Sequence, residues 1–145
     1  MKYFTISDTS PASAITATGD VVPGLQDYDW FTIDAALVGA TGGTLDVYLQ
    51  RLVGDPATST TWRDWLHFPQ LAAGASAVFY SAQSGGPGTT ITSVGNGTTP
   101  VIAVNTFLGG HPGAKVRALY VAGVSTSAGA AVTIVIGAWR STDVR

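Results

Sequence analysis

The two histidines are the first residues to test for catalytic chemistry. His67 closes a tryptophan-rich segment and His111 lies in a Gly/Pro-rich turn. A nucleophilic triad places a histidine beside an activated serine, but the chain has no G-x-S-x-G turn. It also has no H-x-x-x-H pair and no cysteine for a zinc site. We therefore predict a protein that is not an enzyme, without catalytic residues, a metal centre or a cofactor.

The carboxylates allow two other arrangements. Asp27 and Asp29 form a D-x-D pair, which offers part of a calcium site because hard cations take several oxygen ligands. A solvated turn ahead of a strand is the commoner use of such a pair, and the sequence leaves both open. Asp46 and Asp64 lie on adjacent expected strands and are able to approach each other. We favour instead a pairing of Asp64 with an arginine, the candidates being Arg51, Arg63 and Arg117.

Two of the four tryptophans lie close together in one expected strand. Trp62 and Trp65 have opposite strand parity, so one is expected to face the core and one the outside. An outward Trp65 beside Tyr48 would form either a platform for sugar rings or an anchor in a protein interface. We favour a place in the core or in an interface.

These residues lie in a chain that alternates like a β protein. Leu45, Val47 and Leu49 point one way, with polar residues between them. The acidic residues are all aspartate and only two lysines occur, so amphipathic helices are not expected. The sequence predicts an all-β, antiparallel two-sheet sandwich, jelly-roll-like with about eight strands, although a seven-stranded immunoglobulin-like sandwich has a similar pattern. The expected strands are 14–22, 28–33, 43–52, 60–68, 76–81, 101–108, 114–123 and 130–139.

The 145 residues suit a single domain. We expect residues 14–145 to form the sandwich and residues 1–13 to form an extended N-terminal arm, because Ser10-Pro11 interrupts any strand. Lys2, Tyr3 and Phe4 would then be able to reach a partner. The segment 84–100 is rich in glycine and is expected to be a loop. The N-terminus lacks the apolar region of a secretory signal.

Surface composition points to assembly. Charged residues make up 11% of the chain, against roughly a quarter in typical soluble domains, and protein interfaces are depleted in Lys, Glu and Asp. The segment 114–123 is apolar on both faces, as is 130–139, where Val135 and Trp139 lie opposite the other apolar residues. We expect the chain's own loops or a neighbouring subunit to cover the second face. A net charge of −2 with scattered arginines argues against nucleic acid, and no apolar run is long enough to span a membrane.

Four strand motifs resemble small virion proteins of tailed bacteriophages. They are L-D-V-Y-L-Q (45–50), T-W-R-D-W-L-H-F (61–68), K-V-R-A-L-Y-V-A-G (115–123) and V-T-I-V-I (132–136). The resemblance implies a jelly-roll decoration or cement protein, a homo-oligomer and often a trimer, that is made in the host cytoplasm and stabilises the head on the outer surface of the virion capsid. Its partner would be the major capsid protein. The alternative is a glycan-binding or structural module of a phage tail or baseplate. The interface candidates are Lys2, Tyr3, Phe4, Tyr48, Trp65 and Arg117.

Overall fold

The computed structural model describes residues 1–9, 16–38, 44–72, 76–81, 103–104, 106–108, 111–122, 131–140 and 142. They form ten strands and one short 3-10 helix, η1 (Leu25–Asp27). The strands are β1 (Lys2–Thr9), β2 (Thr16–Pro23), β3 (Trp30–Val38), β4 (Thr44–Val53), β5 (Thr61–His67), β6 (Leu71–Ala72), β7 (Ser76–Ser81), β8 (Thr106–Phe107), β9 (Lys115–Ala122) and β10 (Ala131–Trp139). The prediction of an all-β chain is confirmed.

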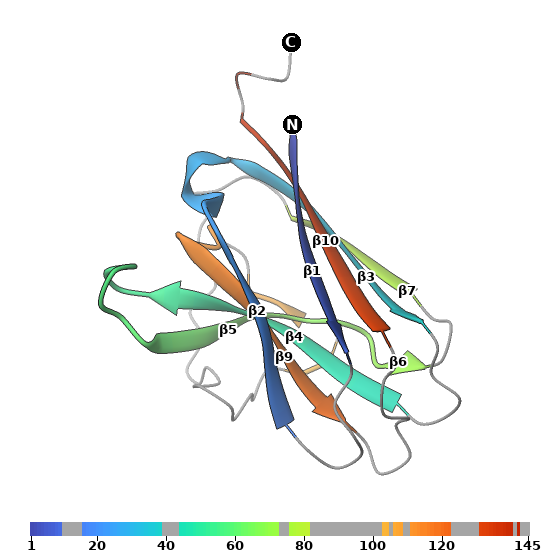
Figure 1. Ribbon diagram of the computed structural model, residues 1–145. Helices are drawn as coiled ribbons and strands as arrows, with labels where there is room; N and C mark the ends of the chain where they lie inside the picture. The colour runs from blue at the N-terminus through green and yellow to red at the C-terminus, as the bar shows by residue number, and fades with distance from the viewer. Residues whose placement is uncertain are drawn as a thin grey trace.

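The strands form two antiparallel sheets that pack against each other (Figure 1). The four-stranded sheet has the order β1-β10-β3-β7. The six-stranded sheet has the order β2-β9-β4-β5-β8, with the short β6 paired to β4. The hairpin of β4 and β5 projects from the sandwich at one side of the view.

The pairing is that of a jelly roll. Apart from the two-residue β6 and β8, eight strands remain, and the first pairs with the last, β1 with β10. The next pairs inward along the chain are β2 with β9, β3 with β7 and β4 with β5. This long antiparallel hairpin is rolled up so that β10 also pairs with β3 and β9 with β4. The predicted jelly-roll-like sandwich is therefore confirmed.

The core lies between the two sheets and follows the alternation of the sequence. Leu45, Val47 and Leu49 are all fully buried in it, as predicted. Each fully buried aliphatic side chain of this size stabilises the fold by roughly 1.5–3 kcal/mol. Among the residues whose burial is described, the largest fully buried side chains are Trp65, Tyr120, Phe31 and Phe68.

The outer face of the six-stranded sheet is also partly covered, which was expected from its apolar residues. Tyr48 and Leu119 lie on this face and are buried together with Leu108, the residue that follows β8. The Leu108 N–H donates to the Trp65 carbonyl at 2.9 Å, which ties this cover to β5. Within the described residues, the chain itself supplies part of the cover.

The prediction of a free N-terminal arm is wrong for residues 2–9. These residues form β1 and pair with β10 without a break, from Lys2 opposite Ala138 to Thr9 opposite Ala131. The physical reason is an alternation that the sequence analysis did not use, since Ile6 is fully buried and Phe4 packs on the core. Residues 10–13 lie outside the described part of the chain.

Asp8 joins the end of β1 to the other sheet. Its Oδ2 accepts a hydrogen bond from the Tyr120 hydroxyl of β9 at 2.5 Å and one from the Asp20 N–H at 3.3 Å. A side chain at Gly19 would lie 2.1 Å from this oxygen, so only glycine permits the approach. Burial, followed by the hydrogen bond to Asp8, raises the pKa of the Tyr120 hydroxyl. The contact fixes one corner of the sandwich.

Two other expectations need correction. Within the expected strand 101–108, Thr106 and Phe107 form β8, whereas Ala103 and Val104 are exposed and lie in no strand; residues 101, 102 and 105 are outside the described part of the chain. The expected strand 28–33 extends to Val38, since the fully buried Ala35 continues its inner face. The expected loop 84–100 lies outside the described residues.

Candidate functional site

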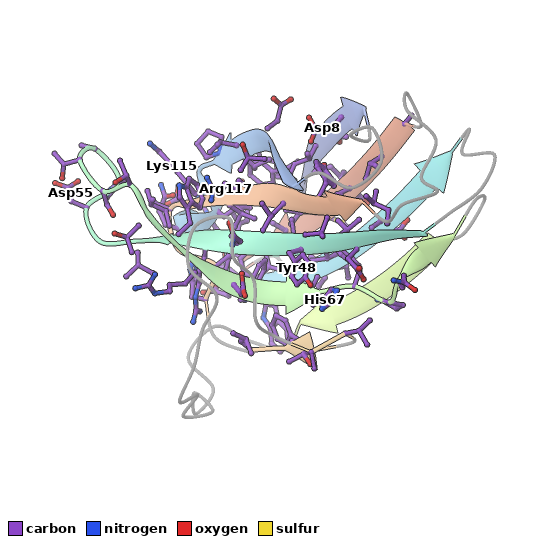
Figure 2. All side chains as sticks on the ribbon, turned by 90° about the horizontal axis from the view of Figure 1, so that it is seen from below. Asp8, Tyr48, Asp55, His67, Lys115 and Arg117 are labelled. Atoms are coloured by element: carbon purple, nitrogen blue, oxygen red, sulfur yellow. The ribbon has the colours of Figure 1, made fainter. Side chains whose placement is uncertain are left out.

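Tyr48 and His67 form a stacked pair on the outer face of the six-stranded sheet (Figure 2). They are direct cross-strand neighbours on β4 and β5, and their ring centroids are 3.8 Å apart at an interplanar angle of 23°. Tyr48 is 8% exposed. Burial, then the charges of Asp46 and Asp64, raise the pKa of Tyr48 to about 12. Tyr48 offers little surface to a partner, and its phenol stays protonated at neutral pH.

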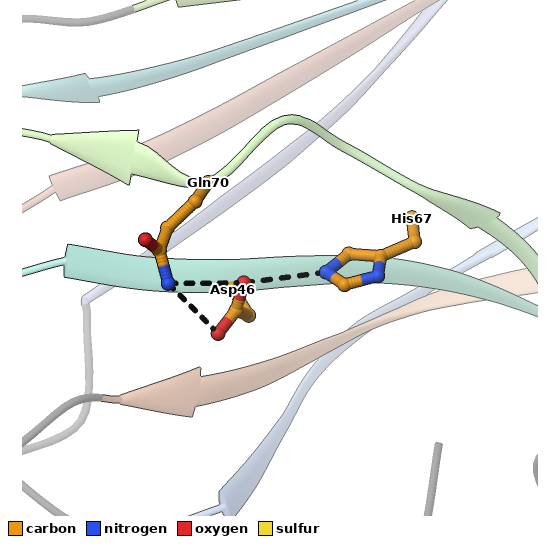
Figure 3. A network of polar contacts seen from close by, with 3 residues as sticks. All are labelled: Asp46, His67 and Gln70. Atoms are coloured by element: carbon orange, nitrogen blue, oxygen red, sulfur yellow. Dashed lines mark hydrogen bonds and ion pairs between the residues drawn. The ribbon is translucent and has the colours of Figure 1, made fainter. Parts of the chain in front are cut away.

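His67 also contacts an acid, as a catalytic histidine would (Figure 3). Its Nε2 lies 3.3 Å from Oδ1 of Asp46, and the Gln70 amide donates to both oxygens of that carboxylate. The His67 side chain is only 6% exposed, because the Tyr48 ring covers one of its faces. The contacts of this buried imidazole with Asp46 and Tyr48 join β5 to β4.

Arg117 belongs to a second polar network on the same face. Its Nε and Nη2 donate to Oε1 of Gln50 at 3.0 and 2.9 Å, and Gln50 Nε2 donates to Oδ1 of Asp64 at 2.8 Å. The guanidinium also lies over the Trp62 ring, 4.5 Å from its centroid. Burial lowers the pKa of Arg117. Gln50 and Asp64 are fully buried, so this network satisfies polar groups that would otherwise destabilise the fold.

The two carboxylates therefore serve separate networks. Asp46 bonds His67 and Gln70, while Asp64 reaches Arg117 through Gln50. The expected pairing of Asp64 with an arginine is thus seen as a contact with Arg117 through the side-chain amide of Gln50. Gln50 was not predicted from the sequence, although its place between Asp64 and Arg117 in the register follows once the three strands are paired.

Trp62 and Trp65 face opposite sides of the sheet, as expected, and of the alternatives for Trp65 the place in the core is the one observed. Trp65 is fully buried and packs edge-on against Phe31 and Phe107, at centroid distances of 6.3 and 5.6 Å. The register of β4 and β5 shifts between Leu49 and Gln50, and this bulge turns Trp65 inward next to Leu66. Trp62 is the outward tryptophan. The proposed sugar platform of Trp65 and Tyr48 is therefore not formed.

Both ring nitrogens of His111 are hydrogen-bonded to backbone groups. Its Nδ1 accepts from the Gly113 N–H at 2.9 Å, so its Nε2 is assigned the proton and donates to the Tyr28 carbonyl, also at 2.9 Å. Its own carbonyl accepts from Arg51. These bonds hold the segment before β9 against β3 and β4, which is a structural role.

Asp27 and Asp29 contribute backbone bonds at the end of the same region. The Asp27 carbonyl accepts from Arg140 Nε at 3.1 Å, and the Asp29 N–H donates to the Trp139 carbonyl. Among the described residues, no three His, Cys, Asp or Glu side chains gather into a group that would hold a metal ion. In the same part of the chain, no helix has the length and apolar character needed to cross a membrane.

The outer face of the four-stranded sheet is the larger candidate surface. On β1, β10 and β3 the inward positions fill the core, so the alternate positions form the opposite face. We call this the neutral face, because Asp34 is its one charged residue among the described side chains. Its members are Tyr3, Thr5, Ser7, Trp30, Thr32, Asp34, Ala36, Thr133, Val135, Gly137 and Trp139.

Gly137 shapes the neutral face at its centre. It lies opposite Tyr3 on one side and Thr32 on the other. A side chain here would meet Thr32 Oγ1 at 2.6 Å and Tyr3 Cε1 at 3.4 Å. Glycine thus lets the Tyr3 ring lie close to β10, with 62% of the residue still exposed. Trp30 and Trp139 are cross-strand neighbours at the end of this face.

The predicted interface residues do not lie on one common surface. Tyr3 is exposed on the neutral face, whereas Phe4 points inward and packs edge-on against Tyr28 at 5.7 Å. Lys2 is exposed, with Nζ 4.8 Å from the Phe4 ring centroid. Tyr48 and Arg117 lie on the other sheet. The prediction that Val135 and Trp139 share a face opposite the core is confirmed. That Thr5, Thr32 and Gly137 lie on the same face follows only from the pairing of β1 and β3 with β10.

No protein-family model, no curated protein and no solved structure matches this chain.

Proposed function

We propose that this protein is a non-enzymatic structural protein of a virion, which binds the outer surface of the capsid and stabilises the head. The major capsid protein is its proposed partner, and the neutral face is the surface that meets it. The strand motifs that resemble phage virion proteins supply the class of protein, and most of their described residues lie on β4, β5, β9 and β10.

The neutral face is the observation that carries this proposal. An outer sheet face with a single carboxylate among its described side chains, Asp34, an exposed tyrosine and two half-buried tryptophans has the composition of a protein interface, where aromatic residues are enriched and charges are few. The jelly-roll fold adds no functional argument, since it also occurs in lectins and cupins.

A binding role also agrees with how the reactive side chains are used. His67, His111 and Asp64 are held in hydrogen bonds that join neighbouring segments of the sandwich. A catalytic acid or base must instead reach the proton that it transfers. Many copies on one lattice would supply affinity through multivalency, so each neutral face need bind only modestly.

The proposal is tested by adding purified protein to capsids of the phage that encodes it, after those capsids have been stripped of this protein. The protein should rebind and raise the temperature at which the heads open. Val135→Lys puts a charge at the centre of the neutral face and should abolish rebinding. The matched control, Val53→Lys, adds the same charge at a 46% exposed position of the β4–β5 hairpin and should bind normally.

Removal of residues 1–13 is not a suitable test, because it deletes β1 and uncovers β10. If intact protein ignores capsids but binds host-surface glycan, it is instead a glycan-binding module of the tail or baseplate.

A further inference from the structure

The free edges of the two sheets differ in their protection. In the six-stranded sheet, β2 is irregular between Thr18 and Val21 and ends at Pro23, and β8 is only two residues long. Bulges, prolines and short strands are three of the usual means of preventing edge-to-edge pairing, and charged residues on the edge strand are another. In the four-stranded sheet, β1 has none of the first three. Its eight residues pair with β10 in unbroken register.

β1 is also uncharged along its middle. Lys2 and Asp8 are its only charged residues, one near each end, and Tyr3, Thr5 and Ser7 between them are exposed. Among the described strands, β1 pairs with β10 alone. Its other side has no strand partner in the described part of the chain, although β2 approaches it at Asp8, and its backbone N–H and C=O groups are those that a further strand would bind.

We propose that this edge binds β1 of a second copy of the chain, in an antiparallel pair with its two-fold axis at Thr5. In this register Lys2 lies opposite Asp8 of the second copy, and the same pair recurs on the other side of the axis. Phe4 lies opposite Ile6 and continues the inner apolar face, while Tyr3 lies opposite Ser7 and continues the neutral face. The result is one continuous eight-stranded sheet.

Charge complementarity selects this register and this partner. A shift of the axis to Phe4 or to Ile6 leaves both charges without an opposite charge across the pair, and a parallel pairing would place like charges together. Asp8 already accepts bonds from Tyr120 and Asp20, but a carboxylate has about four acceptor sites and has room for Lys2. Because a two-fold contact is closed, it gives a dimer, in place of the trimer that the resemblance implies.

A single cysteine tests the axis directly, since the chain has none of its own. In an antiparallel pair, directly opposite Cα atoms are about 4.5–5.5 Å apart, which suits a disulfide. Thr5→Cys should therefore form a disulfide-linked dimer on mild oxidation. Ser7→Cys is the matched control on the same strand and face. It would lie roughly 13 Å from its copy and should remain unlinked.

Sedimentation of the unmodified full chain provides the second measurement. The wild type should sediment as a dimer at micromolar concentration. Thr5→Lys places two like charges face to face and should weaken the dimer by up to about fivefold, whereas Thr18→Lys, an exposed change on the edge of β2, should not. A monomer, a trimer, or equal linking of the two cysteine variants would overturn the proposal. Capsid binding by a monomer would overturn the dimer alone, and leaves the proposed function standing.

Discussion

Replacing Leu49 with alanine tests the packing of the two sheets. Leu49 is fully buried on β4, opposite Leu66 of β5 and Ala118 of β9. The change removes buried methyl groups at a site where the neighbours are held by two strand pairings, so the cavity closes only in part. A loss of about 3 kcal/mol in the free energy of unfolding is expected, within the roughly 2–5 kcal/mol of such replacements. For a chain of this size, that loss lowers Tm by about 6–12 °C.

Urea denaturation followed by tryptophan fluorescence measures this change. Val53→Ala is the matched control, because Val53 belongs to the same strand but is 46% exposed. It should change stability by less than about 1 kcal/mol. Equal effects of the two replacements, or a loss below about 1 kcal/mol at Leu49, would show that the inner face of β4 is not packed as described.

Two further predictions concern tyrosines. Tyr120→Phe removes the hydroxyl that binds Asp8 and should cost about 1–3 kcal/mol in urea denaturation, whereas Tyr3→Phe, at an exposed position, should cost little. The pKa of Tyr48 is raised from 10.0 to about 12, so between these pH values the folded state keeps a proton that the unfolded chain releases. Stability should fall as pH rises through this range, and Tyr48→Phe should make that fall shallower. An unchanged pH profile in Tyr48→Phe would contradict the burial of this phenol.

Strand alternation carried most of the fold prediction. The inward direction of Leu45, Val47 and Leu49 could be predicted because polar residues alternate with them. The predicted strands 43–52 and 76–81 agree with β4 and β7 to within one residue. The same signal was present in β1, where Phe4 and Ile6 alternate with Tyr3, Thr5 and Ser7. This alternation was not used in the prediction because the segment is short, lies at the N-terminus and is followed by Pro11.

The site was less predictable, because it depends on register. The sequence did not decide which of Trp62 and Trp65 faces the core, because this depends on the bulge beside Leu49, which turns Trp65 inward next to Leu66. The neutral face gathers residues from β1, β3 and β10, which are far apart in the sequence. The need for a glycine at position 137 becomes evident only once Tyr3 and Thr32 are known to be its neighbours.

A cryo-EM map of the virion tests the proposed function most directly. We expect density for this sandwich on the outer surface of the head, in many copies, with the neutral face of Tyr3, Val135 and Trp139 turned toward the capsid protein. Absence of the protein from the particle, or density confined to the tail, would contradict it.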